Sequence, residues 1–278
     1  MSLASKYQSL QKNLTELSRV AIAFSGGVDS TLLLKVACDL LGPQQVLALT
    51  STSPVFPRHE TAWCKDFTRQ LGVRHILWHG DELKLTGFVE NSPQRCFHCK
   101  LNLYQHFLTI TREQGFDVLL DGSNLDDLKD YRPGREAVLQ LGIRTPLVDA
   151  GLEKNEIRAL SRQLKLPTWD KPAFACLATR FPYGTPITRE KLEQVGNCES
   201  WFHHQGFSTY RVRIHDRLAR IEIAPEEMPR LLDTALKEEL IHICKTNGFD
   251  YVTLDLQGFR SGSMNECLPE NHKIPESE

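Results

Sequence analysis

The most constraining feature of this sequence is an apolar run that leads into a turn with two adjacent glycines and then into an apolar helical segment. The apolar run covers residues 20–24, and the helical segment continues through Leu34 and Val36. Between them stand Ser25, Gly26, Gly27, Val28, Asp29 and Ser30. A glycine pair lets backbone N–H groups approach an anion, and a helix N-terminus adds the positive end of its dipole. The pattern therefore predicts a buried strand, a phosphate-binding turn and a helix.

This turn differs from the P-loop of ATPases and GTPases, because it lacks the Gly-Lys-Ser/Thr ending that brings a lysine to the β- and γ-phosphates. Instead, Asp29 stands at the helix start, where a carboxylate can hold Mg²⁺ beside a phosphate chain. The pattern SGGxDS resembles the pyrophosphate loop of ATP-pyrophosphatases, which adenylate a carbonyl or carboxyl oxygen and release pyrophosphate. An ordinary strand–turn–helix with a glycine pair is the alternative.

Length and composition limit the class of protein. With 278 residues the chain has room for two domains, and 41% hydrophobic and 24% charged residues are ordinary for a globular protein. A net charge of −2 gives no global attraction to nucleic acid or anionic membrane. No apolar run approaches the roughly 18 residues of a membrane span, and residues 1–14 are too polar for a signal peptide. We therefore expect a cytoplasmic protein without nucleic-acid or membrane partners.

The first part of the chain alternates short apolar runs with helical stretches, which is typical of a parallel α/β sheet flanked by helices. We predict strands at 20–24, 46–50, 74–78 and 117–121, and helices at 58–71, 97–114 and 153–165. Ser51 follows the second strand, and Asp121 and Gly122 lie at the end of the fourth. Ligands of open parallel sheets bind beyond the carboxyl ends of the strands, so these residues are predicted to share the nucleotide site.

Two prolines interrupt the periodicity at residues 166–172. We place the domain boundary directly after this segment, which gives an ATP-binding domain at 1–172 and a smaller α+β domain at 173–278. The second domain is predicted to contain a helix at 188–205, strands at 209–215 and 218–223, a helix at 226–246 and a strand at 250–256.

Three of the eight cysteines stand out. Cys96 and Cys99 form a C-x-x-C motif, and a helix starting there would put both thiols on one face. A thioredoxin-like pair lacks its βαβ context here, and a zinc site lacks an obvious second pair. With Cys176 the motif would supply three thiolates, enough for a [4Fe–4S] cluster with one open iron; two unligated cysteines remain the alternative. Cys38, Cys64, Cys198 and Cys244 lie in helical patterns and are interpreted as small core or surface residues, and Cys267 stands in a polar tail.

Cys176 lies in a segment rich in Pro and Gly at the predicted domain junction. A loop cysteine beside Lys171 and Arg180 would be partly exposed with a lowered pKa, as a reactive thiolate requires. A buried loop cysteine is the alternative.

Two alternating runs in the second domain predict a β-hairpin. Arg211 and Arg213 fall on one face of its first strand, and Arg260 follows a later strand. Paired guanidinium groups suit bidentate phosphate binding, whereas a half-buried hairpin with a solvated charged face is the alternative. Glu199 and Glu222 could bind a divalent ion, although lone glutamates are normally solvated.

Together these motifs resemble the LarE family, the ATP-dependent sulfur transferases of nickel-pincer nucleotide biosynthesis. The resemblance covers nearly the whole chain and is carried by residues 25–30, 120–122, 130–134, 176, 180–185, 211–213, 251–256 and 258–262. It implies that ATP adenylates a carboxylate of pyridinium-3,5-biscarboxylic acid mononucleotide, and that sulfur delivered at Cys176 displaces AMP to leave a thiocarboxylate. Arg211, Arg213 and Arg260 would hold the substrate phosphate.

The cysteines resemble the three-cysteine branch of that family. This implies that Cys96, Cys99 and Cys176 ligate a [4Fe–4S] cluster that relays sulfur. In the better-known branch a single cysteine gives up its own sulfur and becomes dehydroalanine, and this sacrificial route is one alternative. Two further alternatives are a tRNA thiolase and a non-catalytic nucleotide-binding regulator. A tRNA thiolase should carry a broad basic surface or an RNA module. The expected partner is a small nucleotide substrate, with a homo-oligomer left open.

Overall fold

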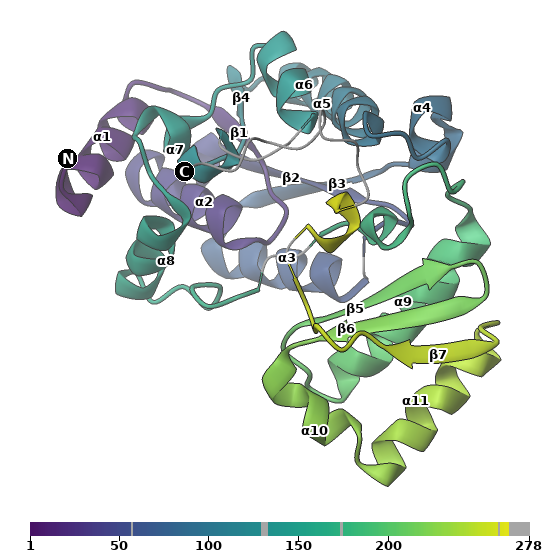
Figure 1. Ribbon diagram of the computed structural model, residues 1–278. Coiled ribbons are helices and arrows are strands. Elements are labelled where there is room, and N and C mark those ends of the chain that lie inside the picture. Colours follow the sequence, from purple (N-terminus) through teal and green to yellow (C-terminus); the bar gives the residue numbers. More distant parts are fainter. Residues whose placement is uncertain (57, 129–132, 173–174, 261, 267–278) are drawn as a thin grey trace. The chain divides into compact units, whose positions relative to one another are not determined.

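The computed structural model describes residues 1–56, 58–128, 133–172, 175–260 and 262–266 of this chain. The chain divides into two compact units, each with its own sheet (Figure 1). The first consists of Met1–Ser53, Arg58–Gly80 and Cys96–Phe174, and the second of Pro54–Pro57, Asp81–Arg95 and Ala175–Glu278. The main division lies close to residue 172, while two short earlier segments group with the second unit. The assignment of ATP and substrate phosphate to separate domains stays a prediction.

The first unit is built on a four-stranded parallel sheet with the order β3-β2-β1-β4. Its strands are β1 (Val20–Ala23), β2 (Val46–Thr52), β3 (Arg74–His79) and β4 (Val118–Leu120). β1 lies between β2 and β4, with Val20 opposite both Val46 and Val118. The parallel α/β sheet predicted from the alternating pattern is confirmed.

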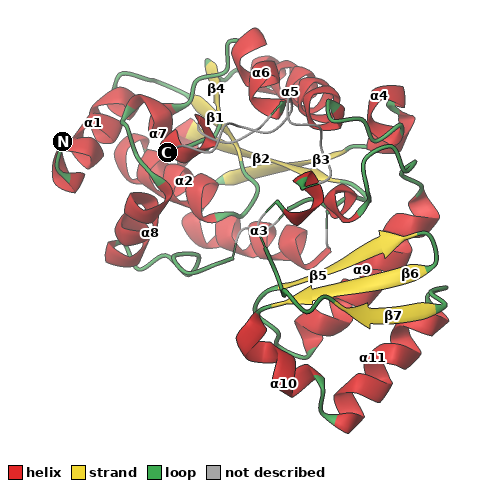
Figure 2. Ribbon diagram, in the orientation of Figure 1, coloured by secondary structure: helices red, strands yellow, loops and turns green. Residues whose placement is uncertain are grey.

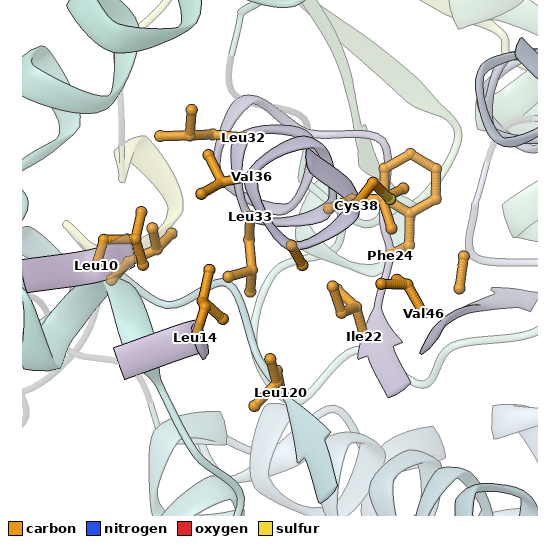
Figure 3. Close-up of a cluster of buried hydrophobic side chains, with 14 of the residues drawn as sticks. Leu10, Leu14, Ile22, Phe24, Leu32, Leu33, Val36, Cys38, Val46 and Leu120 are labelled. Atoms are coloured by element: carbon orange, nitrogen blue, oxygen red, sulfur yellow. The ribbon is translucent and has the colours of Figure 1, made fainter. Parts of the chain in front are cut away.

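Helices flank this sheet, as Figure 2 shows. They are α1 (Leu3–Thr15), α2 (Val28–Leu41), α3 (Arg58–Leu71), α5 (Arg95–Glu113), α6 (Gly134–Gln140), α7 (Pro146–Asp149) and α8 (Lys154–Gln163). Side chains of α1, α2, α3 and α8 share one core cluster with Ile22 of β1. Figure 3 labels Leu14 of α1 and Leu33 of α2 together with Ile22. Ala21, the preceding residue, belongs to a second cluster with Phe107 of α5 and Val138 of α6. Successive strand residues face opposite sides, so β1 must be apolar throughout, and each fully buried leucine of these clusters contributes roughly 1.5–3 kcal/mol.

The second unit is an α+β structure with a three-stranded mixed sheet (Figure 2). Its strands are β5 (Tyr210–His215), β6 (Leu218–Ile223) and β7 (Tyr251–Leu254), and its helices are α4 (Thr86–Val89), α9 (Arg189–His204), α10 (Met228–Leu231) and α11 (Thr234–Thr246). β5 and β6 are antiparallel, while β6 and β7 are parallel. α9 packs against β5, and α11 packs against α9 and β7. The predicted α+β character of this part is confirmed.

The prediction of a single helix over 226–246 is wrong. The chain leaves the helical conformation at Asp233, where φ is −51° and ψ is 136°. The Asp233 side chain accepts hydrogen bonds from the N–H groups of Ala235 and Leu236 and so caps a new helix. An aspartate inside an apolar helical pattern therefore marked a break between α10 and α11.

Four cysteines predicted as small helix residues are buried in helices: Cys38, Cys64, Cys198 and Cys244. Cys267 lies outside the described residues. Among the described helices, none is both long and apolar enough to cross a membrane.

Candidate active site

The turn between β1 and α2, two elements located in Figure 1, has the backbone geometry of an anion-binding site. α2 begins directly after Gly27, and no side chain of the described residues caps its first N–H groups. Gly26 adopts φ +74°, and a Cβ there would lie 2.8 Å from the Sγ of Cys64. Only glycine therefore fits this position, and the uncapped helix start is open to an anion.

Two serine hydroxyls hold the turn closed. The Oγ atoms of Ser25 and Ser30 are 3.1 Å apart, and the Oγ of Ser30 donates to the carbonyl of Gly27 at 3.3 Å. The N–H of Gly27 points to the Oγ of Ser25 at a long 3.4 Å. This weak contact leaves the N–H readily available to a better acceptor, such as a phosphate oxygen.

Asp29 lies at the start of α2 with its side chain 20% exposed. Its carboxylate accepts hydrogen bonds from the Nζ of Lys154 and, at 3.3 Å, from the Nδ2 of Asn124. Burial raises the pKa of Asp29, and the neighbouring ammonium of Lys154 opposes that rise. A half-buried carboxylate that is already balanced by a cation suits the exchange of that cation for Mg²⁺.

The carboxyl end of β4 meets the start of α2. A Cβ on Gly122 would lie 3.1 Å from the backbone nitrogen of Ser30, so any larger residue would press on the start of α2. The neighbouring carboxylate of Asp121 accepts from the hydroxyl of Tyr104 and from the N–H and hydroxyl of Ser123. Burial alone would raise the pKa of Asp121, but Lys100 and these donors outweigh it and lower the pKa. Asp121 is thus held as a carboxylate.

Ser51 lies within β2, which continues to Thr52 and is two residues longer than predicted. Its Oγ is buried and has no hydrogen-bond partner among the described residues. A buried orphan hydroxyl is rare in a folded protein. It is consistent with a ligand group beside the carboxyl end of the sheet.

The first unit thus brings the predicted nucleotide residues to one edge of its sheet. They are Ser25, Gly26, Gly27, Asp29, Ser30, Ser51, Asp121 and Gly122. The polar atoms fit a phosphate chain with Mg²⁺, although the assignment of these residues to ATP stays a prediction. Sequence reasoning missed Lys154, whose only signal was its position near the start of a predicted helix.

The cysteines of the C-x-x-C motif lie in the first turns of α5. Cys96 is exposed and Cys99 is half-buried, and neither forms a disulfide with another described cysteine. Cys176 belongs to the second unit, where it precedes a 3₁₀ turn at Leu177–Arg180, and its Sγ accepts from the N–H of Ala178 at 3.3 Å. Within the described parts of the chain, no three His, Cys, Asp or Glu side chains gather as ligands of a metal ion. The cluster therefore stays a prediction and no reaction step is derived through it.

Arg180 binds the backbone around Cys176. The guanidinium forms two 2.8 Å bonds to the Glu199 carboxylate, and the side chain is fully buried. Its Nη1 donates to the carbonyls of Ala175 at 3.0 Å and Cys176 at 3.3 Å. Glu199 in turn accepts from the N–H of Val212 in β5 at 2.9 Å. The thiol-bearing turn is therefore fixed to α9 and β5.

The two arginines of β5, Arg211 and Arg213, are buried, so the alternative of a solvated charged face is wrong. Arg211 is 8% and Arg213 is 4% exposed. Arg213 donates to Glu222 at 2.8 Å, yet its Nε is buried and has no hydrogen-bond partner in the described residues. Burial lowers the pKa of Arg211 to about 10, and the like charges of Arg180 and Arg213 add to this effect. The strand therefore holds a concentrated positive charge that an anion would stabilise.

Arg260 differs from the two strand arginines. Its side chain is 29% exposed and pairs with Glu266 at 3.1 Å and with Asp255 at 3.6 Å.

Glu199 and Glu222 are bound to arginines, which leaves little room for the divalent ion considered for them. Asp130, Tyr131 and Arg132 of the family motif, and Ser261 after Arg260, lie outside the described residues.

The parallel sheet and its glycine-paired turn define an α/β domain of the pyrophosphate-loop (PP-loop) class. One chain of the glutamine-hydrolyzing GMP synthase from Saccharolobus solfataricus is 26% identical over 202 residues, covering 64% of this chain and 52% of that relative. The pyridinium-3,5-bisthiocarboxylic acid mononucleotide synthase of Lactiplantibacillus plantarum is 37% identical over 267 residues, which is 96% of each chain. This chain belongs to the family of that synthase, the LarE family.

A further relative is an uncharacterized Synechocystis protein, slr1717, which is 41% identical over 96% of this chain and 99% of its own length. No protein-family model matches the sequence. The expected family membership is confirmed, and it makes this protein a member of an enzyme family.

Proposed function

We propose that this protein is an ATP-dependent sulfur transferase. It converts a carboxylate of pyridinium-3,5-biscarboxylic acid mononucleotide into a thiocarboxylate and forms AMP and pyrophosphate. The single observation that carries the proposal is the 37% identity with the synthase along almost the entire length of both chains. The uncapped start of α2, with its glycine-paired turn, supports the use of ATP.

The nucleotide site supports the first half of the reaction. The N–H groups at the start of α2 bind the phosphate chain, and Asp29 holds Mg²⁺, which neutralises phosphate charge when bound. The substrate carboxylate attacks the α-phosphorus and pyrophosphate leaves. In the resulting acyl adenylate, the leaving group on the carbonyl carbon is AMP instead of a poorly leaving oxygen.

The second half requires a sulfur nucleophile. A sulfur held at Cys176 attacks the activated carbonyl carbon, and the C–O bond to AMP breaks. The thiocarboxylate is freed when the bond between this sulfur and its carrier breaks; if the carrier is Cys176 itself, this is the Cβ–Sγ bond and dehydroalanine remains. Arg211, Arg213 and Arg260 hold the substrate phosphate. The Nε of Arg213, which has no partner among the described residues, supports this role because a phosphate oxygen would satisfy it.

For the source of sulfur we propose that Cys96, Cys99 and Cys176 ligate a [4Fe–4S] cluster. Such a cluster supplies an iron that no protein ligand occupies, and this iron can bind sulfide. The support is the resemblance of these three positions to the three-cysteine branch of the family, and none of the three forms a disulfide with another described cysteine. Sacrifice of the Cys176 sulfur, leaving dehydroalanine, is the competing source.

The remaining proposals concern partners and location. The substrate is a small nucleotide rather than nucleic acid or membrane, and the protein acts in the cytoplasm, with assembly into a homo-oligomer left open. The net charge of −2 supports the absence of a nucleic-acid partner.

The test is to incubate the protein with ATP, Mg²⁺, the biscarboxylic acid mononucleotide and sulfide, and to follow AMP and the product mass. AMP that depends on the mononucleotide, together with the mass of a thiocarboxylate, supports the proposal. AMP formed with tRNA and not with the mononucleotide would favour a tRNA thiolase. ATP binding without turnover of any acceptor would favour a nucleotide-binding regulator.

A further inference from the structure

Lys171 reaches the proposed nucleotide turn, residues 25–30, from a distant part of the first unit. Its Nζ lies 3.1 Å from the carbonyl oxygen of Gly26 and 2.6 Å from Oε2 of Glu60 in α3. The same ammonium lies 4.8 Å from the centre of the Trp63 ring. The sequence motif itself contains no lysine, so this cation is supplied to the turn from outside it.

The backbone that carries Lys171 is fixed by α8. Arg158 donates from Nη1 to the carbonyl of Trp169 at 2.9 Å and from Nη2 to the carbonyl of Lys171 at 2.8 Å. The guanidinium of Arg162, one helical turn further on, lies 5.1 Å from the Trp169 ring centre. The Lys171 side chain therefore starts from a held backbone, and Glu60 and Trp63 restrict its ammonium.

The bond to Gly26 has a geometric consequence for the turn. In a trans peptide the carbonyl oxygen and the following N–H point in opposite directions. Holding the Gly26 oxygen toward Lys171 therefore directs the Gly27 N–H to the other side, where Ser25 and Ser30 place their hydroxyls. Gly26 needs this restraint because, without a Cβ, it can adopt many backbone conformations.

We propose that Lys171 is a positioning residue for ATP: it fixes the Gly26–Gly27 peptide so that the Gly27 N–H is aimed at the phosphate chain before ATP arrives. Glu60 and Trp63 hold the ammonium in place. Pre-organised donors increase affinity because binding then costs less ordering of the protein. This inference rests on the proposed ATP site and adds a residue to it.

The test measures ATP binding directly, by calorimetry without an acceptor, and AMP formation separately. We expect Lys171→Met to raise the Kd for ATP about tenfold, which corresponds to about 1.4 kcal/mol. The KM for ATP should rise in parallel and kcat should change less. Lys171→Arg should recover most of the affinity, because arginine can still donate to the Gly26 carbonyl. Lys165→Met is the control, since Lys165 is an exposed residue of the same unit and loses the same charge.

A folded Lys171→Met protein whose Kd for ATP stays within twofold of the wild-type value would overturn the inference. If Lys171→Met does not fold, Glu60→Gln decides, because it keeps the side-chain shape and removes the negative charge that holds the Lys171 ammonium. A rise in Kd of about threefold in Glu60→Gln supports the inference, and an unchanged Kd overturns it. Wild-type protein that binds no ATP would refute the ATP site itself. Wild-type protein that binds ATP but makes no thiocarboxylate would refute only the proposed reaction.

Discussion

The ammonium of Lys154 at the start of α8 pairs with the carboxylate of Asp29 at the start of α2, 125 positions away in the sequence. Both residues belong to the first unit. The pair brings two helix N-termini together at the carboxyl edge of the sheet. A divalent ion bound by Asp29 would compete with Lys154 for the carboxylate, so changes at Asp29 should affect the proposed nucleotide site directly.

Asp29→Ala is expected to abolish AMP formation while the fold is retained. The change removes the carboxylate that would hold Mg²⁺, and Lys154, with its side chain 32% exposed, can turn to solvent. The measurement is AMP production by chromatography, with circular dichroism as the check of folding. Normal AMP release by folded Asp29→Ala protein would refute the assignment of this residue.

Gly122→Ala should weaken ATP binding by pressing on the start of α2. The added Cβ would lie 3.1 Å from the nitrogen and 3.2 Å from the Cα of Ser30, and neither atom can move without shifting the helix start. We expect a rise in the KM for ATP of about tenfold. Gly196→Ala in α9 is the control, since its nearest neighbour is a leucine methyl group at 3.3 Å. Equal effects of the two changes would show that the packing at Gly122 has no special role.

The fold was predictable where a pattern is local. The wholly apolar run at β1 indicates a strand covered on both faces, and the structure places it in the middle of the sheet. The contacts of Lys154 and Lys171 with the nucleotide turn span 125 and 145 positions, and no periodicity records them. The alternation around Arg211 correctly separated two faces of a strand. It could not tell that both faces are buried, because burial depends on what packs against a face.

Stability should fall in mild acid through His75. Burial lowers the pKa of His75 to about 4, from an ordinary value of about 6.5. Between about pH 6.5 and about pH 4, His75 is protonated in the unfolded chain but stays neutral in the folded protein. The free energy of unfolding therefore decreases as the pH falls through this range. His75→Gln removes this contribution, and its urea unfolding should depend less on pH across that window. Identical pH profiles of the two proteins would contradict the prediction.

Arg211→Ala and Arg213→Ala should weaken binding of the phosphorylated substrate far more than binding of ATP. Each lost charged hydrogen bond should cost on the order of 1.5–3 kcal/mol. The Kd of each ligand is measured separately, after unfolding curves confirm a folded protein, because Arg213→Ala also removes a partner of buried Glu222. Arg217→Ala, which changes an exposed arginine next to the same hairpin, is the control. Equal losses for both ligands would argue against a phosphate role.

The cysteines yield the last prediction, which concerns Cys96, Cys99 and Cys176. Protein reconstituted without oxygen should hold about four irons, since each thiolate binds one iron of a compact cube and the fourth iron is left without a cysteine. Replacement of any one of the three by serine should lower the iron content. Cys64→Ser is the control, because Cys64 is buried beside the nucleotide turn and belongs to no predicted ligand set.

The same protein should turn over more than once when sulfide is supplied, and the mass of the peptide that contains Cys176 should stay constant. A cluster returns its sulfur-binding site after each cycle, whereas a sacrificial cysteine loses its Cβ–Sγ bond and is used up. Sulfide should therefore raise the number of turnovers only if the sulfur is external. Protein that binds no iron and carries dehydroalanine at position 176 after one turnover would refute the cluster and leave the Cys176 sulfur as the source.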